Sequence, residues 1–213
     1  TVTRIMIEVK NIEKSFDGKR ILKGISTTFE TGKTNLIIGQ SGSGKTVLLK
    51  SLLGIHTPES GQICFDGRVY SELDKNEKRD LRTEIGMVFQ GSALFDSMTV
   101  AENVGFPLRM FTNDNNAKIK ERVDFVLERV ALIDAHTKLP SQISGGMQKR
   151  VAIARAIVNR PKYLFCDEPN SGLDPNTSIL IDNLIKEITE EYDITTVINT
   201  HDMNSVMEIG DNI

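Results

Sequence analysis

Three features are scarce in this sequence, and each scarcity excludes a class of protein. Its 213 residues include only two cysteines, Cys64 and Cys166, which are too far apart in sequence to read as a disulfide framework or a metal-ligand motif. Basic residues number 26 against 29 acidic ones, so the net charge of −3 supplies no basic field for a nucleic acid. No apolar run approaches the length of about 20 residues that crosses a bilayer, and no signal peptide is visible. We therefore expect a globular protein of a reducing compartment, with both thiols in its core and no nucleic-acid partner.

What is present is the composition of an ordinary globular chain, with 39% hydrophobic and 26% charged residues. The length suits a single domain over residues 1–213, built as one core with a smaller lobe packed on it. The sequence begins at Thr1, and Met6 would make a plausible native start. It stops at Asn212–Ile213, where a further strand is expected to begin, so we expect the C-terminal end to be truncated.

Residues 39–46 match a phosphate-binding loop of the form G-x-x-x-x-G-K-[ST]. A strand is predicted before the loop, over residues 34–38, and a helix after it that starts at Lys45 and ends at Gly54. These flanking elements distinguish a working loop from a glycine- and serine-rich surface turn, which is the alternative interpretation. The residues expected to surround the nucleotide are Gly39, Gln40, Ser41, Gly42, Ser43, Gly44, Lys45 and Thr46.

The residue types in this loop account for anion binding. Its glycines allow positive φ and close approach of the backbone, so successive N–H groups can turn toward an anion. The N-terminal end of the following helix adds partial positive charge at the same point. Lys45 can reach the outer phosphates, and the Thr46 hydroxyl can ligate Mg²⁺. The loop therefore predicts binding of a nucleoside triphosphate with Mg²⁺.

Alternating apolar and polar residues, punctuated by turn dipeptides, predict a strand-rich first part of the chain. Asp66-Gly67 lies between two short β-like runs and is a strong hairpin signal. The charged run from Lys75 to Arg82 is expected to form a solvated helix face. Strands are predicted over residues 5–9, 21–29, 62–65, 68–70 and 85–89.

The second part of the chain alternates helical and strand-like patterns. Apolar spacings of three and four predict helices over residues 119–130 and 147–158 and a crossover helix around 181–188. Buried-strand runs lie at residues 163–166 and 194–198. Strands separated by helices pair in parallel, so we expect an α/β fold: a doubly wound P-loop core with helices on both faces of the sheet. An antiparallel β part precedes this core, and a helical lobe is inserted over about residues 91–160.

Two acidic residues, Asp167 and Glu168, end the strand-like run before Pro169. In an open parallel sheet, ligands bind at the C-terminal ends of the strands, where the phosphate loop also lies. Neighbouring residues of a strand point to opposite sides, so one carboxylate can orient Mg²⁺ through water while the other polarises an attacking water. The alternative interpretation is an exposed acidic turn.

A second helix start is also suited to an anion. Ser144 can cap a helix that opens with Gly145 and Gly146, although a plain capped helix would have the same pattern. The chain thus has two phosphate-seeking helix starts but one triphosphate loop. They can bind one nucleotide together only if the lobes fold across it or if two chains share it.

Taken in order, these segments resemble the motifs of ATP-binding cassette (ABC) transporter ATPases over nearly the whole chain. Ile143–Gln148 resembles the signature motif of that family, and Asp167–Glu168 its Walker B acid and catalytic glutamate. Further matches are Gln90 in the loop that joins the core to the helical lobe, Ser171–Asp174 as the D-loop, His201 as the switch histidine, and Phe16 where an aromatic ring stacks on adenine. By the alternative interpretation, Phe16 is a core residue of the first hairpin.

The resemblance implies a RecA-like core and an Mg-ATP-hydrolysing subunit of a transporter, whose cofactors are ATP and Mg²⁺. Two copies would dimerise head to tail, so that the signature serine and glycines of one copy contact the γ-phosphate held by the other. A separate integral-membrane permease would be the partner. The implied catalytic residues are Glu168, His201 and Gln90, the implied metal-binding residues are Thr46, Gln90 and Asp167, and further nucleotide contacts are implied for Phe16, Ser144, Gly145, Gly146, Asp167 and Asp174.

Three departures from the family pattern are Phe16 for tyrosine, Ile143 for leucine and Met147 for glutamine, and none removes a group needed for hydrolysis. The Ser-Gly-Gly-Met signature, with residues 91–100 and 102–109, resembles the ATPase subunit of bacterial Mla-type transporters, which move phospholipid between the inner and outer membranes. This implies a homodimer at the cytoplasmic face of the bacterial inner membrane, with a permease and a substrate-binding lipid-carrier subunit. Otherwise, residues 93–108 are simply the apolar face of the lobe.

Four other classes of protein would also contain a phosphate loop of this kind. They are the ATPase of a small-solute transporter, a soluble cassette that acts on ribosomes or DNA, a docking module that does not hydrolyse nucleotide, and a small-molecule P-loop kinase. Soluble cassettes usually carry two cassettes or a long coiled-coil insertion, and this sequence has neither. Glu168 and His201 argue against a docking module, and the signature motif argues against a kinase.

Overall fold

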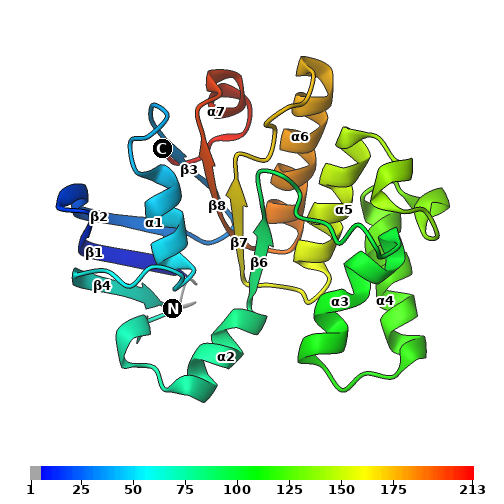
Figure 1. Cartoon of the computed structure of the whole chain (residues 1–213), viewed down its shortest axis with the longest axis horizontal. Helices are drawn as coiled ribbons and strands as arrows, with labels where there is room; N and C mark the ends of the chain where they lie inside the picture. Colours follow the sequence, from blue (N-terminus) through cyan, green and yellow to red (C-terminus); the bar gives the residue numbers. More distant parts are fainter. Residues whose placement is uncertain (1–5) are drawn as a thin grey trace.

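The computed structural model describes residues 6–213, apart from the side chain of residue 204, and contains two four-stranded sheets with helices packed on them (Figure 1). The antiparallel sheet has the order β2-β1-β4-β5, with β1 (Met6–Phe16), β2 (Lys19–Glu30), β4 (Ser60–Phe65) and β5 (Arg68–Val69). The parallel sheet has the order β3-β8-β7-β6, with β3 (Thr34–Ile38), β6 (Ile85–Val88), β7 (Tyr163–Asp167) and β8 (Thr195–Thr200). The predicted α/β fold, with its antiparallel first part, is confirmed.

Turn dipeptides set both hairpins of the antiparallel sheet. Asp17 and Gly18 have φ of 49° and 76° between β1 and β2, and Asp66 and Gly67 have φ of 50° and 79° between β4 and β5. Positive φ at both central residues gives the turn twist that matches paired strands. β1 and β2 are longer than predicted, because irregularities in their register let the pairing continue past Val9 to Phe16. The predicted strand residue Ile5 lies outside the described residues.

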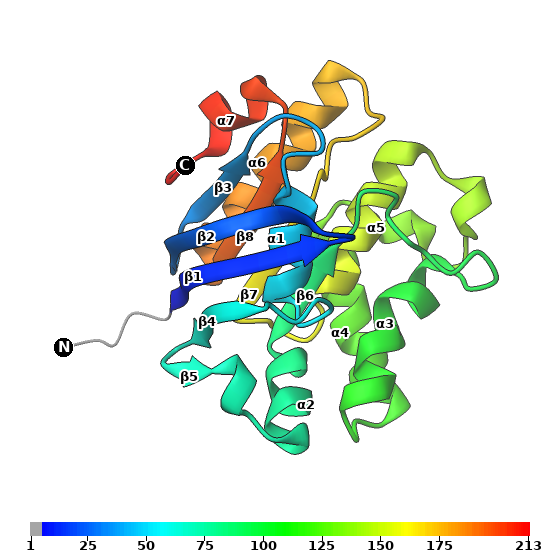
Figure 2. The same cartoon turned by 60° about the vertical axis from the view of Figure 1, so that its left-hand side comes forward.

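Helices cover both faces of the parallel sheet (Figure 2). On one face, α1 (Lys45–Leu52) lies between the parallel and antiparallel sheets, and on the other lie α5 (Gly145–Ile157) and α6 (Pro175–Glu191). Alternate residues of β7 serve the two faces: Tyr163 and Phe165 pack with α1 and the antiparallel strands, while Leu164 and Cys166 pack with α5 and α6. Cys64 and Cys166 are buried and free, as predicted.

The segment between β6 and β7 is mostly helical and contains α3 (Val100–Phe111), α4 (Asn116–Arg129), α5 and two short 3₁₀ turns, η2 (Ile133–Ala135) and η3 (Pro140–Gln142). The predicted helices over 119–130 and 147–158 are found as α4 and α5. The pattern did not predict α3, which contains Gly105 and Pro107. The lobe boundaries of about 91–160 remain a prediction.

Charge keeps α2 (Lys75–Thr83) at the surface, after a 3₁₀ turn η1 (Tyr70–Glu72). Asp74 caps α2 by accepting from the N–H groups of Asn76 and Glu77, and the Glu77 carboxylate accepts from the Asp74 N–H at 2.7 Å. Among the residues of α2 only Leu81 is buried, so the predicted solvated helix face is confirmed.

Asn35, near the start of β3, connects the two sheets and is only 2% exposed. Its amide nitrogen donates to the main-chain oxygens of Glu30 at 3.0 Å, Lys33 at 3.1 Å and Thr196 at 3.0 Å. Its amide oxygen accepts from the Glu30 N–H and from the Asn212 amide, both at 3.0 Å. The strand predicted to begin at residue 212 is reduced to an isolated parallel bridge between Asn35 and Asn212.

Candidate nucleotide-binding site

The phosphate loop connects β3 to α1, and its glycines are required by its geometry. Gly44 is the N-cap of α1 with φ of 103°, and a Cβ on it would lie 2.9 Å from the Ile21 side chain. A Cβ on Gly39 would lie 2.8 Å from the Ser43 hydroxyl oxygen. Side chains at these two positions would therefore clash with their neighbours, and glycine lets the backbone turn its N–H groups toward an anion. As predicted, α1 begins at Lys45.

Lys45 places a buried ammonium group inside the loop. The residue is 9% exposed, and its Nζ donates to the main-chain oxygens of Gly39 at 2.7 Å and Gln40 at 3.1 Å. Its Nζ also lies 4.0 Å from the Glu168 carboxylate. The ammonium group therefore sits between the phosphate loop and the acidic end of β7, where it can pair with a phosphate oxygen.

Glu168 follows β7 in a left-handed backbone conformation, with φ of 47°. Its N–H donates to both the side-chain oxygen of Asn199, at 2.9 Å, and the Asn199 carbonyl, at 3.1 Å. The carboxylate pairs with His201, whose Nδ1 lies 2.5 Å from Oε2. The strand ends at Asp167, so the turn at Glu168, rather than strand alternation, separates the two carboxylates. Strained backbone supported in this way is typical of a functional site.

Asp167 fits the metal-binding role that the resemblance implied. Its Oδ1 is buried and has no hydrogen-bond partner among the described residues, which leaves a carboxylate oxygen available to a ligand. Thr46 lies at the start of α1, where a hydroxyl oxygen can join such a ligand set. Mg²⁺ prefers oxygen ligands and retains several waters, so two protein oxygens with phosphate oxygens would suffice. The residues present therefore fit Mg²⁺.

A cavity of about 500 Å³ brings together residues from six segments of the chain. The ring of Phe16 at its edge is 39% exposed, so the alternative interpretation of Phe16 as a core residue is wrong. The predicted residues that line this cavity are Phe16, Ser41, Gly42, Gly44, Lys45, Thr46, Gln90, Glu168 and His201. Residues 90, 168 and 201 thus meet the phosphate loop, although they are far apart in the sequence.

The second predicted anion site lies elsewhere. Ser144, Gly145, Gly146 and Asp174 do not line the 500 Å³ cavity. Ser144 caps α5 by accepting from the Met147 N–H at 3.3 Å, and Asp174 caps α6 by accepting from the Thr177 N–H at 3.0 Å. Hydrogen bonds from Thr177 hold the pKa of the Asp174 carboxyl below its usual value. Ser144 and Gly145 are exposed, so the start of α5 is open to a ligand from outside this chain.

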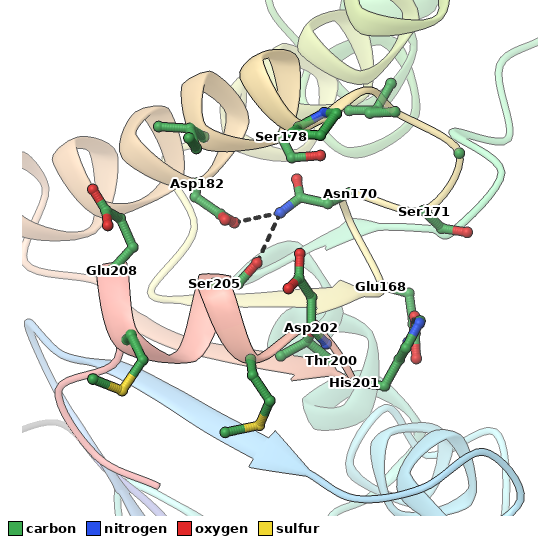
Figure 3. Close-up of a pocket in the computed structure, with 16 residues that line it drawn as sticks. Glu168, Asn170, Ser171, Ser178, Asp182, Thr200, His201, Asp202, Ser205 and Glu208 are labelled. Carbon is green, nitrogen blue, oxygen red and sulfur yellow. Dashed lines mark hydrogen bonds and ion pairs between the residues drawn. The ribbon is translucent and has the colours of Figure 1, made fainter.

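A larger cavity of about 630 Å³ adjoins Glu168 and His201 and lies between α6 and α7 (Met203–Ile209) (Figure 3). The Asn170 amide donates to Asp182 at 2.7 Å and to Ser205 at 3.1 Å, and so joins the loop after Glu168 to both helices. Burial raises the pKa of the Asp182 carboxyl above its usual value, despite these hydrogen bonds. The sequence analysis missed this cluster, because nothing in the local pattern indicates contacts between residues 170, 182 and 205.

The loop of Gln90 was predicted, but the contacts that hold it were not. The Gln90 side-chain amide donates to the Ser171 hydroxyl of the D-loop at 3.1 Å. Its main-chain carbonyl accepts from Lys149 of α5. Lys149 directly follows the signature motif. The only sign of this contact in the sequence is that a lysine occupies a position on the inward-packing face of the predicted helix.

Comparisons with known proteins show which family the chain resembles in sequence. A family model described as ABC transporter matches residues 22–171. The probable ribonucleotide transport ATP-binding protein mkl of Mycobacterium tuberculosis is 40% identical over 212 residues, which cover 98% of this chain and 58% of that protein. The methionine import ATP-binding protein MetN of Carboxydothermus hydrogenoformans is 44% identical over 211 residues, which cover 98% of this chain and 62% of that protein. The chain thus spans about three fifths of the length of these curated relatives.

Solved structures also match over most of the chain. A protein of Clostridium perfringens that is part of the ABC transporter complex cbiONQ superposes with a TM-score of 0.86 at 35% identity, covering 94% of this chain and 80% of that one. A dimeric bacterial ABC transporter cassette superposes with a TM-score of 0.85 at 33% identity, covering 95% and 91%. A post-hydrolysis form of such a cassette, bound to ADP and phosphate, also gives a TM-score of 0.85. This chain is therefore an ATP-binding cassette and belongs to the ABC transporter family.

Proposed function

We propose that this cassette binds and hydrolyses Mg-ATP as a head-to-tail homodimer and powers a separate membrane permease. Lys45 and the phosphate loop bind the phosphates, while Thr46, Gln90 and Asp167 hold Mg²⁺, which neutralises charge on the phosphates when bound. Glu168 polarises the attacking water, and His201 fixes the position of the Glu168 carboxylate through the 2.5 Å contact. Phe16 packs against the base.

One observation is the main support for the proposed dimer. The start of α5 has an exposed Ser144 and Gly145, yet it does not line the cavity that contains Lys45 and Glu168. A single chain therefore cannot place both helix starts on one nucleotide in this conformation. A second copy can complete each site, and a structural relative of this chain is a dimer.

Disulfide formation tests this arrangement. With Ser43→Cys and Gly145→Cys in one chain, ATP is expected to promote a disulfide-linked dimer, visible on a non-reducing gel. Position 145 can accept a side chain, because a Cβ there would lie 3.9 Å from the nearest heavy atom, on Leu173. Each single variant is the matched control and should stay monomeric on the gel. If the double variant forms no more dimer with ATP than without it, the shared site is wrong.

A groove at the helical lobe supports the permease as partner. It has a volume of about 290 Å³ and is lined mainly by residues of β6, α3 and the segment between them. Apolar side chains at this groove are unusually exposed: Phe89 at 41%, Phe95 at 41%, Met110 at 53% and Phe111 at 38%. A clustered apolar surface of this kind marks a protein contact. Among the described residues no helix is both apolar enough and long enough to cross a bilayer.

For the cargo, we propose phospholipid, moved between the inner and outer membranes of a bacterium, with the cassette at the cytoplasmic face of the inner membrane. The Ser-Gly-Gly-Met signature at residues 144–147 and the sequence of the groove segment support this choice, as does the resemblance on which it rests. A lipid-carrier subunit would then be a further partner. The relative named for methionine import favours a small solute as the second candidate.

Stimulation of hydrolysis distinguishes the two cargoes. We expect phosphate release by the cassette–permease complex in detergent to rise when phospholipid is added and to be unaffected by methionine. The same complex carrying Glu168→Gln is the control for contaminating ATPases. Stimulation by methionine and not by phospholipid would overturn the lipid assignment while leaving the ATPase assignment intact.

A further inference from the structure

Lys149 is a buried lysine to which the proposed mechanism of ATP hydrolysis assigns no role. It lies on α5 and is only 4% exposed. Its ammonium group donates to the main-chain carbonyl of Gln90, 59 residues earlier in the chain. Burial lowers the pKa of the Lys149 ammonium group, because the charged form loses hydration. Burying a charge against a neutral carbonyl is costly, so the contact calls for an explanation.

The segment that Lys149 holds has a strained backbone. Ser92 and Ala93, which follow Gln90 and Gly91, have φ of 61° and 48°. Consecutive non-glycine residues in the left-handed region persist only where surrounding contacts support them. Arg155, also on α5, supplies such contacts: its guanidinium donates to the carbonyl of Ser92 and to that of Ala93, both at 2.8 Å.

Lys149 and Arg155 are six residues apart on one helix, so α5 holds both ends of the 90–93 segment. The N-terminal end of the same helix has an exposed N-cap, Ser144, and an exposed first residue, Gly145. The side chain of Gln90 lines the 500 Å³ cavity, and Arg155 lines the apolar groove. One helix thus connects the signature motif, the main chain of Gln90 and the groove.

We propose that Lys149 is a positioning residue for ATP hydrolysis, which acts by holding the Gln90 main chain to the signature helix so that the two move as one unit. This inference rests on the proposed function of the cassette. When the start of α5 shifts onto a nucleotide of the second copy, Lys149 carries that shift to Gln90 of its own site. Arg155 supports the same segment from the groove side, but its two bonds end on residues that do not line the cavity.

A double-variant cycle tests the assignment. Lys149→Met removes the donor and keeps an unbranched side chain, and Gln90→Ala removes the side chain that it positions. For the cassette with its permease, we expect Lys149→Met to lower kcat about tenfold with KM for ATP changed less than about twofold. The double variant is expected to be no slower than Gln90→Ala alone, because residues that act through one another are not additive. Lys149→Arg, which restores a charged donor, should recover most of kcat.

Two controls separate this role from plain stability. Lys118→Met removes an exposed lysine of the same lobe, 68% exposed at its side chain, and should leave kcat unchanged. If Lys149→Met does not fold, Lys149→Ala, which also removes the donor, replaces it in the same cycle. Multiplicative losses in the double variant, or an unchanged kcat in a folded variant that lacks the Lys149 donor, would overturn the proposal. Failure of the parent complex to hydrolyse ATP would instead refute the proposed function.

Discussion

Replacing Glu168 with glutamine is expected to leave ATP binding intact and to slow hydrolysis by about 10²- to 10⁴-fold, the usual range for loss of a general base. Glutamine keeps the size of the side chain and can still meet His201, but it cannot accept a proton from water. The backbone around it should not change, because the Glu168 N–H is held by Asn199 through two bonds and not by the carboxylate. The substitution also removes a negative charge that lies 4.0 Å from the Lys45 ammonium group, which favours retention of the negatively charged phosphates.

Phosphate release and nucleotide binding must be measured on the same preparation, with the permease present. Glu187→Gln is a suitable control, since that glutamate is 62% exposed at its side chain and pairs with Arg129 away from the cavity. It should match the parent protein in both assays. A Glu168→Gln protein whose turnover stays within about tenfold of the parent would show that another group supplies the base.

Lys45→Ala is expected to abolish measurable ATP affinity. Among the residues that the structure describes, Lys45 and His201 are the basic side chains that line the 500 Å³ cavity, and removal of the Lys45 ammonium group takes its charge-assisted bonds away from the phosphates. Charge-assisted hydrogen bonds to a buried group are worth about 1.5–3 kcal/mol each, so loss of two such bonds lowers affinity by roughly 10²- to 10⁴-fold.

Fluorescence titration with a labelled ATP analogue measures this loss directly. Lys50→Ala, at an exposed position of the same helix, is the matched control and should bind as the parent does. Circular dichroism of both variants shows whether α1 is intact. Micromolar binding that persists in a folded Lys45→Ala protein would contradict the assignment of the loop as the phosphate cradle.

Local patterns predicted those parts of the fold that short segments determine on their own. The phosphate loop, both hairpin turns and the alternation of strand and helix after Gln90 were all read from segments of a few residues, and each is found. The helix α3 was missed because Gly105 and Pro107 interrupt the pattern. Gly105 lets α3 pack closely against α4, since a Cβ at position 105 would lie 3.2 Å from Val123 of α4. Close packing of two helices, which propensity does not represent, outweighs the local cost of glycine.

The sequence predicted which residues form the site but not how they are held in position. Motif order identified Gln90, Glu168 and His201, and the structure brings them to one cavity with the phosphate loop. The left-handed turn at Glu168 and the contact from Lys149 to Gln90 could not be predicted, because both depend on partners 31 and 59 residues away. Long-range hydrogen bonds of this kind leave no period in the sequence.

The amide of Asn35 has a consequence for ligand choice. It fastens the end of β2 to β3 and β8, so the two sheets keep one relative orientation near the base of the phosphate loop. Phe16 ends β1 on one sheet, and the loop begins where β3 ends on the other. The two sheets therefore fix the distance between the Phe16 ring and the phosphate loop. For the proposed stacking of the base on Phe16, a ligand with a planar ring at one end and phosphates at the other would have to match this span in length.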